Sequence, residues 1–258
     1  MSLHAVKTGT SPKDERVRQG RIDLAAAFRM AARYGWNEAV ANHFSLAVSD
    51  DGRRFLMNPQ GRHWARMTAS DILELDTDAG TGAIGSGAGK ADPTAWHIHS
   101  RIHAMMPEAR CVLHTHMVYA TTLACLKDYR LQMIDQNAMR FYNRIAYDDD
   151  FNGMALDGQE GGRIGSAMKG KSVMFMANHG VAVVAGSVAE AFDEMYYLER
   201  ACQVQVMALQ TGRPLNVVSD AIAELTCRQW HEYPADAAHD HFNELKRILD
   251  REEPEYAS

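Results

Sequence analysis

Apolar residues recur at helical spacing in several stretches of the chain. In the first stretch Leu24, Phe28 and Ala31 fall on one face, as in a helix that covers a core. Start signals accompany two later stretches, an Asp92 N-cap before a proline and a capping box that begins at Ser187. The expected helices cover residues 14–34, 93–106, 118–126 and 187–210, with two more helical segments after residue 219.

Shorter apolar runs between these helices predict strands. Asp50-Asp51-Gly52 predicts a hairpin turn between the first two runs, and Asn178-His179-Gly180 a tight reversal between the last two. Strands and helices alternate without the regular rhythm of a doubly wound fold, and no Gly-rich nucleotide motif follows a strand. The expected strands cover residues 44–48, 54–57, 72–76, 111–116, 171–177 and 181–185.

Two stretches of the chain carry little apolar content. Residues 1–13 are polar and charged and are expected to form a flexible N-terminal arm. Residues 80–91 are rich in Gly, Ala and Ser and are expected to form a mobile loop. Residues 14–258 are expected to form one domain, with C-terminal helices from about residue 213.

Composition narrows the class of protein. The chain has 258 residues, a net charge of -6 and 46% hydrophobic residues, which are ordinary values for a globular protein with a substantial core. The mild acidity argues against nucleic acid as a partner, because phosphate contacts need a basic face. No apolar run is long enough to span a bilayer, and residues 1–18 lack the apolar core of a signal peptide. We therefore expect a cytoplasmic protein with no membrane partner. Its four cysteines include no Cys-x-x-Cys pair and are expected to be reduced thiols.

Histidine pairs provide the first sign of chemistry. Twelve histidines make chance pairs common, and His-x-His occurs three times, but helical residues two apart cannot share an ion. Strand residues two apart point to the same face. Of the three pairs, only His114 and His116 fall in a predicted strand. The other pairs, His97 with His99 and His239 with His241, fall in predicted helices.

A third imidazole completes a candidate metal site. His179 is expected at the tip of the tight reversal between two buried strands, where it can face inward. Three imidazoles with an open fourth position are typical of a catalytic zinc site, and imidazole also suits other divalent metals. From spacing alone, ordinary core or surface histidines remain the alternative. His99 and His103 lie four apart on a helix and form either a hydrogen-bonded face or a proton donor near the metal.

Several ordered motifs resemble the class II aldolase and adducin family. Cys111–His116 is similar to the family's metal strand, and Asn178–Val181 followed by Ser187–Phe192 is similar to its second landmark. The resemblance covers roughly residues 18–212, and Asp150–Gly153 is closest to the adducin-like branch. Further motifs in family order are 21–34, 42–45, 58–61 and 107–109.

This resemblance implies a fold, a metal and an assembly. The fold is a three-layer α/β/α sandwich with a central mixed, mostly antiparallel sheet. The metal is divalent, with zinc expected first and Mn, Fe, Co or Ni as alternatives, and its ligands are His114, His116 and His179. The assembly is a cyclic homotetramer with sites between neighbouring subunits. In the aldolases the metal polarises substrate oxygens and stabilises an enediolate, and a glutamate acts as the acid and base.

The sequence departs from the family at that glutamate. Its position aligns with Ala95, which cannot transfer a proton, so standard aldolase chemistry is in question. The phosphate-binding positions are also altered, because Ala41 and Gln60 replace the usual residues. This favours a smaller or carboxylate-bearing substrate over a sugar phosphate. The expected substrate-binding residues are Asn42, Gln60, Gly61, Arg62 and Thr94.

Two main functions follow from these residues. The first is a metal-dependent lyase that acts on a small hydroxy- or oxo-acid or a sugar-like substrate by retro-aldol cleavage or decarboxylation. Its proton carrier would be His99, Tyr142, Glu160 or a metal-bound water. The second is a non-catalytic, adducin-like binding or assembly module that keeps the metal site. Oxygen chemistry at a three-histidine iron is a third, minor alternative.

Overall fold

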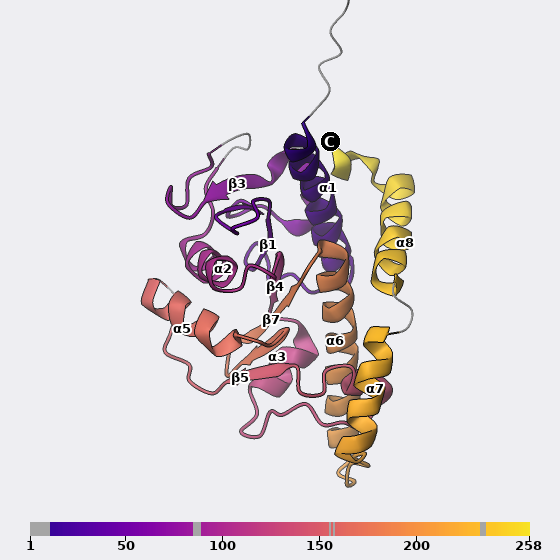
Figure 1. The fold of residues 1–258 in the computed structure, drawn as a ribbon. Coiled ribbons are helices and arrows are strands. Elements are labelled where there is room, and N and C mark those ends of the chain that lie inside the picture. The colour runs from indigo at the N-terminus through magenta and orange to yellow at the C-terminus, as the bar shows by residue number, and fades with distance from the viewer. Residues whose placement is uncertain (1–10, 85–88, 155, 157, 233–235) are drawn as a thin grey trace, which may run out of the picture.

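A seven-stranded mixed sheet forms the centre of the protein (Figure 1). The computed structural model describes residues 11–84, 89–154, 156, 158–232 and 236–258, and the strand order is β3-β2-β1-β4-β7-β6-β5. β5 pairs with β6 in parallel, and the other neighbouring pairs are antiparallel. The strands are β1 His43–Ala47, β2 Arg54–Met57, β3 Leu73–Asp76, β4 Cys111–Thr115, β5 Ile145–Asp148, β6 Val173–Met176 and β7 Gly180–Ala185.

Helices cover both faces of this sheet, which confirms the expected three-layer α/β/α fold (Figure 1). α2 and α5 lie on one face, and α1, α6 and α8 lie on the other. The helices are α1 Pro12–Arg33, α2 Pro93–Met105, α3 Val118–Ala124, α4 Gln136–Met139, α5 Gly158–Met168, α6 Val188–Gln210, α7 Asp220–Glu232 and α8 Ala237–Glu252. Short 3₁₀ turns add Trp64–Arg66, Ala69–Asp71 and Pro254–Ala257.

Alternation along β1 decides which side chains reach the candidate site. Phe44 points to the α1 side, where its ring stacks on Phe28 at 4.6 Å between centroids. His43 and Ser45 flank Phe44 and point to the opposite face, where both hydrogen bond to His99 of α2. The period of two in a strand therefore puts an aromatic core on one face and a polar row on the other.

The predicted start signals of the helices are present. Asp92 caps α2 by accepting a hydrogen bond from the Thr94 backbone at 2.9 Å, and Ser187 caps α6 by accepting one from Glu190 at 3.2 Å. α1 begins at Pro12, two residues before its expected start, with Ser11 as its cap. Residues 1–10 of the expected arm and 85–88 of the expected loop lie outside the described residues.

α4, α5 and β5 were not predicted from the sequence. The α5 segment is rich in glycine, which is unfavourable in an isolated helix. Its glycines allow a close approach to α2, because a Cβ atom built on Gly161 would lie 2.4 Å from the His97 carbonyl oxygen. β5 has four residues and lies at the edge of the sheet, where a short apolar pattern gives little signal.

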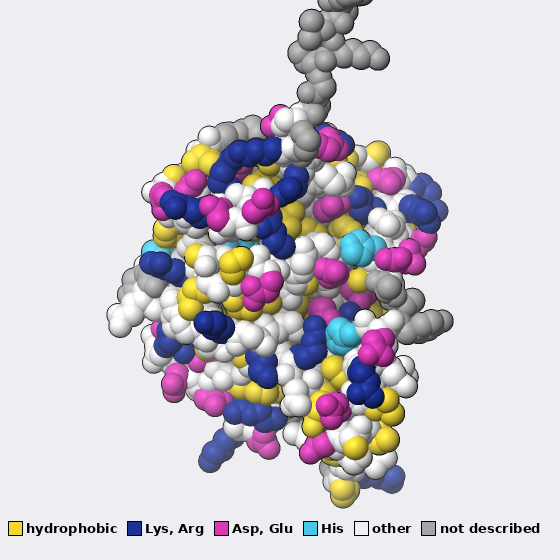
Figure 2. Space-filling model, viewed as in Figure 1, with side chains coloured by type: hydrophobic (Ala, Val, Ile, Leu, Met, Phe, Trp, Pro, Cys, Tyr) yellow, Lys and Arg dark blue, Asp and Glu magenta, His cyan; other side chains and the backbone are white. Residues whose placement is uncertain are grey.

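Acidic and basic side chains are interspersed on the face of the molecule shown in Figure 2. This view therefore contains no extended basic surface over the described residues. Within the same part of the chain, no helix combines the length and the apolar character that crossing a membrane requires.

Candidate metal centre

Three histidines in β4, just after β4 and just before β7 converge at one end of the sheet. His114 lies in β4, His116 follows the end of that strand, and His179 lies in the reversal between β6 and β7. One ring nitrogen from each of the three lies within 4.8 Å of those of the other two. The residue after His179 must be small, because a Cβ atom on Gly180 would lie 2.6 Å from the Thr115 carbonyl oxygen.

A hydrogen bond orients the imidazole of His114, and a buried ring nitrogen of His116 has no partner in the described part of the chain. Nδ1 of His114 lies 2.9 Å from the Val181 carbonyl oxygen, which can only accept, so Nδ1 carries the proton and Nε2 keeps its lone pair. Nε2 of His116 is buried and has no hydrogen-bond partner among the described residues, while its Nδ1 lies 3.9 Å from Glu38. A divalent metal would satisfy both nitrogens, so the residues present fit such an ion.

Burial keeps the three rings neutral. Removal from water holds the pKa of His114 well below its usual range, and the neighbouring histidines add to this effect. Burial together with His116 lowers the pKa of His179 to about 4. Burial also lowers the pKa of His116, although Glu38 acts against it. Neutral imidazoles are the form that binds a metal ion, because the lone pair must be available.

The three imidazoles line a cavity of about 310 Å³. Its wall is partly polar and partly apolar, and the apolar part includes exposed side chains of the segment after β5. A cavity of this size suits a small ligand. The other lining residues are His43, Thr94, Ile98, Phe151, Gly153, Met154 and Asn178.

His43 is a fourth imidazole in this wall that the sequence analysis did not single out. Its ring centroid lies 4.8 Å from that of His114, its register partner across β1 and β4. Its Nδ1 lies 2.7 Å from Nε2 of His99, which is fully buried and does not line the cavity. His43 lies one residue before the predicted strand of residues 44–48, so its alternation with Phe44 and Ser45 indicates which face it shares with Ser45 but no role at a metal centre.

Two of the predicted substrate-binding residues meet beside the cavity. Thr94 lines it, and the Thr94 hydroxyl donates to Asp92 at 2.5 Å. Gln60 is exposed and donates to the other carboxylate oxygen of Asp92 at 2.8 Å. Asp92 therefore positions both side chains as well as capping α2.

The other predicted substrate-binding residues lie outside the cavity wall. Asn42 is buried with a positive φ of 68°, and its Oδ1 has no hydrogen-bond partner among the described residues. Gly61 has a φ of 81° and open space where a Cβ would lie. Arg62 forms an ion pair with Asp71 at 2.9 Å.

The candidate proton carriers lie at different positions relative to the metal cavity. Tyr142 does not line the cavity, and its carbonyl oxygen lies 3.6 Å from the Cys227 sulfur of α7. Glu160 lines a small adjoining pocket that also includes His179, and it forms an ion pair with Arg163 at 2.6 Å. Of His99, Tyr142 and Glu160, Glu160 alone therefore shares a pocket with a histidine of the candidate centre.

Ala95, at the position of the family's glutamate, is almost fully buried and does not line the cavity. It belongs to an apolar cluster beside β2 and β3. The buried members of that cluster are Phe55, Met57, Leu73, Leu75, Ala91 and Ala95.

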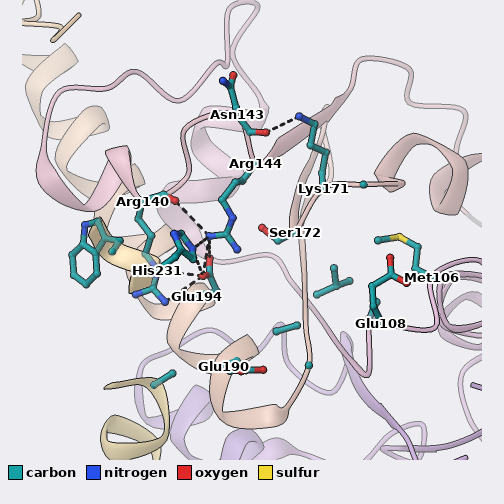
Figure 3. A pocket seen from close by; sticks show the side chains of 17 residues that line it. Met106, Glu108, Arg140, Asn143, Arg144, Lys171, Ser172, Glu190, Glu194 and His231 are labelled. Atoms are coloured by element: carbon teal, nitrogen blue, oxygen red, sulfur yellow. Dashed lines mark hydrogen bonds and ion pairs between the residues drawn. The ribbon is translucent and has the colours of Figure 1, made fainter. Parts of the chain in front are cut away.

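A second cavity, of about 540 Å³, lies at the opposite end of the strands (Figure 3). Its positive groups already have partners: Arg144 pairs with Glu194 at 3.0 Å, and Lys171 donates to the Asn143 carbonyl at 2.6 Å. Although burial opposes it, His231, Arg144 and Arg140 lower the pKa of Glu194 to about 2. We interpret this group as an ion cluster that ties α4 and α7 to α6.

Comparison with known proteins places this geometry in context. A family profile described as "Class II Aldolase and Adducin N-terminal domain" matches residues 22–206. A Caulobacter vibrioides protein, whose name assigns it provisionally to aldolase class 2, is 33% identical over 195 residues, which cover 76% of this chain and 74% of the relative. Human beta-adducin is 29% identical over 216 residues, which cover 81% of this chain and 28% of the adducin.

A solved structure extends this likeness to the whole chain. The crystal structure of an aldolase II superfamily protein from Pseudomonas syringae is similar with a TM-score of 0.86 at 31% sequence identity. The similarity covers 99% of this chain and 100% of the other. It therefore includes the C-terminal helices beyond the segment matched by the family profile.

Proposed function

Because the chain belongs to the class II aldolase and adducin family, we propose that it is a metal-dependent lyase that acts on a small hydroxy- or oxo-acid or a sugar-like substrate. The reaction would be retro-aldol cleavage or decarboxylation. One observation carries this proposal: three neutral imidazoles, from His114, His116 and His179, converge on the wall of a cavity of about 310 Å³. Zinc is the metal we expect first, and Mn, Fe, Co or Ni are alternatives.

The chain's own residues would bind and orient the substrate. A divalent metal held by the three histidines would polarise substrate oxygens and stabilise the negative charge of an enolate. The Thr94 hydroxyl lies in the same wall and can bind a polar group of the substrate. Ile98, Phe151 and Met154 make part of the wall apolar, which excludes water from a bound ligand.

The second candidate function is the adducin-like binding or assembly module. It is favoured by the likeness to beta-adducin and by the alanine at position 95. A module of this kind needs neither a metal nor a small ligand. Because such a module can still keep the metal site, absence of metal would favour the module, whereas bound metal is necessary for the lyase but does not by itself exclude the module.

The first experiment is elemental analysis of the purified, untagged protein beside its His114→Ala/His116→Ala variant. We expect about one metal ion per chain in the wild type and almost none in the variant. The matched control is His239→Ala/His241→Ala, which removes a histidine pair of the same spacing from α8 and should keep the metal. Absence of metal from the wild type, even after soaking with Zn or Mn, would leave the adducin-like module as the better proposal.

A cyclic homotetramer and a cytoplasmic location belong to the same proposal. Both are expectations from the sequence and its resemblance to the family. Light scattering coupled to gel filtration would measure the mass of the assembly against the 28.7 kDa of one chain. A monomer at micromolar concentration would contradict the tetramer and would leave the metal proposal untouched.

A further inference from the structure

A continuous chain of hydrogen bonds runs from the interior of the protein to the metal cavity. It begins at the Ala109 carbonyl oxygen, 3.0 Å from Nδ1 of His103. Nε2 of His103 lies 2.7 Å from the Ser45 hydroxyl, which lies 2.5 Å from Nδ1 of His99. Nε2 of His99 lies 2.7 Å from Nδ1 of His43, which lines the cavity.

The spacing of these residues explains how the chain forms. His99 and His103 lie four apart on α2 and so share one helix face. His43 and Ser45 lie two apart on β1 and so share the sheet face that packs on α2. All four side chains are buried, and His99 and His103 are completely inaccessible to solvent.

The three imidazoles of the chain are neutral. Burial is the largest cause that lowers the pKa of the two helical rings, to about 4 for His103 and well below the usual range for His99. Among the described residues, no carboxylate accepts a hydrogen bond from these rings, so none stabilises a second proton on them. Each ring therefore has one N–H donor and one acceptor nitrogen.

A carbonyl oxygen can only accept, and this fixes the direction of every bond in the chain. Nδ1 of His103 must carry the proton, so Nε2 of His103 accepts the Ser45 hydroxyl proton. The Ser45 oxygen then accepts from Nδ1 of His99, which leaves Nε2 of His99 as an acceptor. Nδ1 of His43 must donate to it. The remaining nitrogen of His43, Nε2, then has no proton, and the hydrogen bond of this ring among the described residues is made by Nδ1.

We propose that this one-way chain holds the Nε2 lone pair of His43 at the metal cavity as a fixed hydrogen-bond acceptor. His43 is then a specificity-determining residue that selects a ligand with a hydroxyl group beside its metal-binding oxygen. His99, Ser45 and His103 are the positioning residues that keep His43 in this tautomer. The ligand class rests on the proposed function, whereas the tautomer rests on the hydrogen bonds alone.

The proposed substrate class was hydroxy- or oxo-acids. This inference favours the hydroxy acids and disfavours the oxo-acids. A hydroxyl beside the metal-binding oxygen can donate to Nε2 of His43. A keto oxygen in the same place would put one lone pair against another, so the bound ligand would leave this acceptor without a donor. A site built to accept from a hydroxyl discriminates against analogues that lack it, here by at least about tenfold.

Nitrogen NMR of the metal-free protein tests the tautomer directly. In ¹⁵N-labelled wild type we expect His43, His99 and His103 each to show a protonated Nδ1 and an unprotonated Nε2. Ser45→Ala removes one link, and His43 should then show a mixture of tautomers. The control Ser100→Ala removes another buried hydroxyl of the same region and should leave all three patterns unchanged. A protonated Nε2 on His43 in the wild type would overturn the proposal, whether or not the protein binds metal.

Calorimetry of the zinc-loaded protein tests the ligand class with L-lactate and pyruvate as probes. We expect the wild type to bind lactate at least about tenfold more tightly than pyruvate. His43→Phe keeps an aromatic ring but removes the acceptor, so this ratio should fall to about one while the zinc content stays the same. Equal binding or no binding of the two probes by the wild type would refute the assigned specificity. Loss of zinc in His43→Phe would show that His43 is a ligand instead.

Discussion

At the residue scale, the direction in which a side chain points decides whether it can take part in chemistry. Ala95 and Thr94 are neighbours on the first turn of α2, yet Thr94 lines the metal cavity and Ala95 lies in an apolar cluster. A side chain at position 95 therefore lies in the cluster that contains Phe55 and Leu73 and outside the wall of the cavity. The alanine fits its surroundings, and a carboxylate there would need a different local packing.

We predict that Ala95→Glu destabilises the protein and does not restore an acid. A carboxylate buried among apolar side chains without a partner loses its hydration, so the free energy of unfolding should fall by about 3 kcal/mol or more. Urea unfolding would measure this change. Ala104→Glu, the same substitution at an exposed position of α2, should change stability by less than about 0.5 kcal/mol. A stable Ala95→Glu protein with a retro-aldol activity above wild type would contradict the placement of this side chain.

The residues of the candidate centre were only partly predictable from the sequence. His114, His116 and His179 could be selected because strand geometry and a tight turn restrict where their rings can point. His43 could not, since its importance depends on a hydrogen bond to a helix 56 residues away. Tyr142 was selected as a candidate proton carrier, and only tertiary structure shows that its neighbours are in α7.

At the scale of elements, the contact between α2 and α5 could not be predicted from the sequence pattern. α5 has four glycines in its first eight residues, a composition that usually indicates a loop. Their role depends on the partner helix, because Gly161 faces the α2 backbone and Gly162 faces open space. Helix propensity depends only on the local sequence, so it cannot predict a helix that is stabilised by contact with a distant segment. Elements with strong local signals, such as α1, α2 and α6, were confirmed with small changes at their ends.

The two adjacent glycines provide a matched pair of substitutions. Gly161→Ala would put a Cβ atom 2.4 Å from the His97 carbonyl oxygen, so α5 must move, and we expect a loss of about 2 kcal/mol or more in unfolding free energy. Gly162→Ala meets nothing within 4 Å and should stabilise the helix by about 0.5–1 kcal/mol. Thermal or urea unfolding of both variants would measure the difference. Equal effects of the two substitutions would show that the helices are not in close contact.

At the scale of the whole molecule, the buried histidines link the candidate site to the pH dependence of stability. Six histidines, His43, His99, His103, His114, His116 and His179, have lowered pKa values because burial disfavours the charged ring. Between pH 6.5 and about 4, His103 and His179 are protonated in the unfolded chain but not in the folded protein, and the other lowered rings act in the same direction. The unfolded state then binds more protons, so stability falls as the pH falls.

One buried carboxyl acts in the opposite direction. Burial raises the pKa of Glu199 to about 7, against the two backbone N–H groups of Tyr119 and Ala120 that donate to it. Between its ordinary value and pH 7 the folded protein binds the extra proton, so this group adds stability as the pH falls. Its contribution is close in size to that of one histidine, and six histidines oppose it.

We therefore predict that the metal-free protein loses at least about 2 kcal/mol of unfolding free energy between pH 7.5 and pH 5. His103 and His179, each with a pKa of about 4, contribute about 2 kcal/mol each, and Glu199 offsets about one of these contributions. Urea titrations at the two pH values would measure the loss. Glu199→Gln removes the opposing group and should make the loss larger, whereas His239→Gln, at an exposed position, should leave it unchanged. Stability that stays constant or rises towards pH 5 would mean that the buried rings are protonated in the folded protein. In that case the hydrogen-bond chain that ends at His43 could not have a single direction.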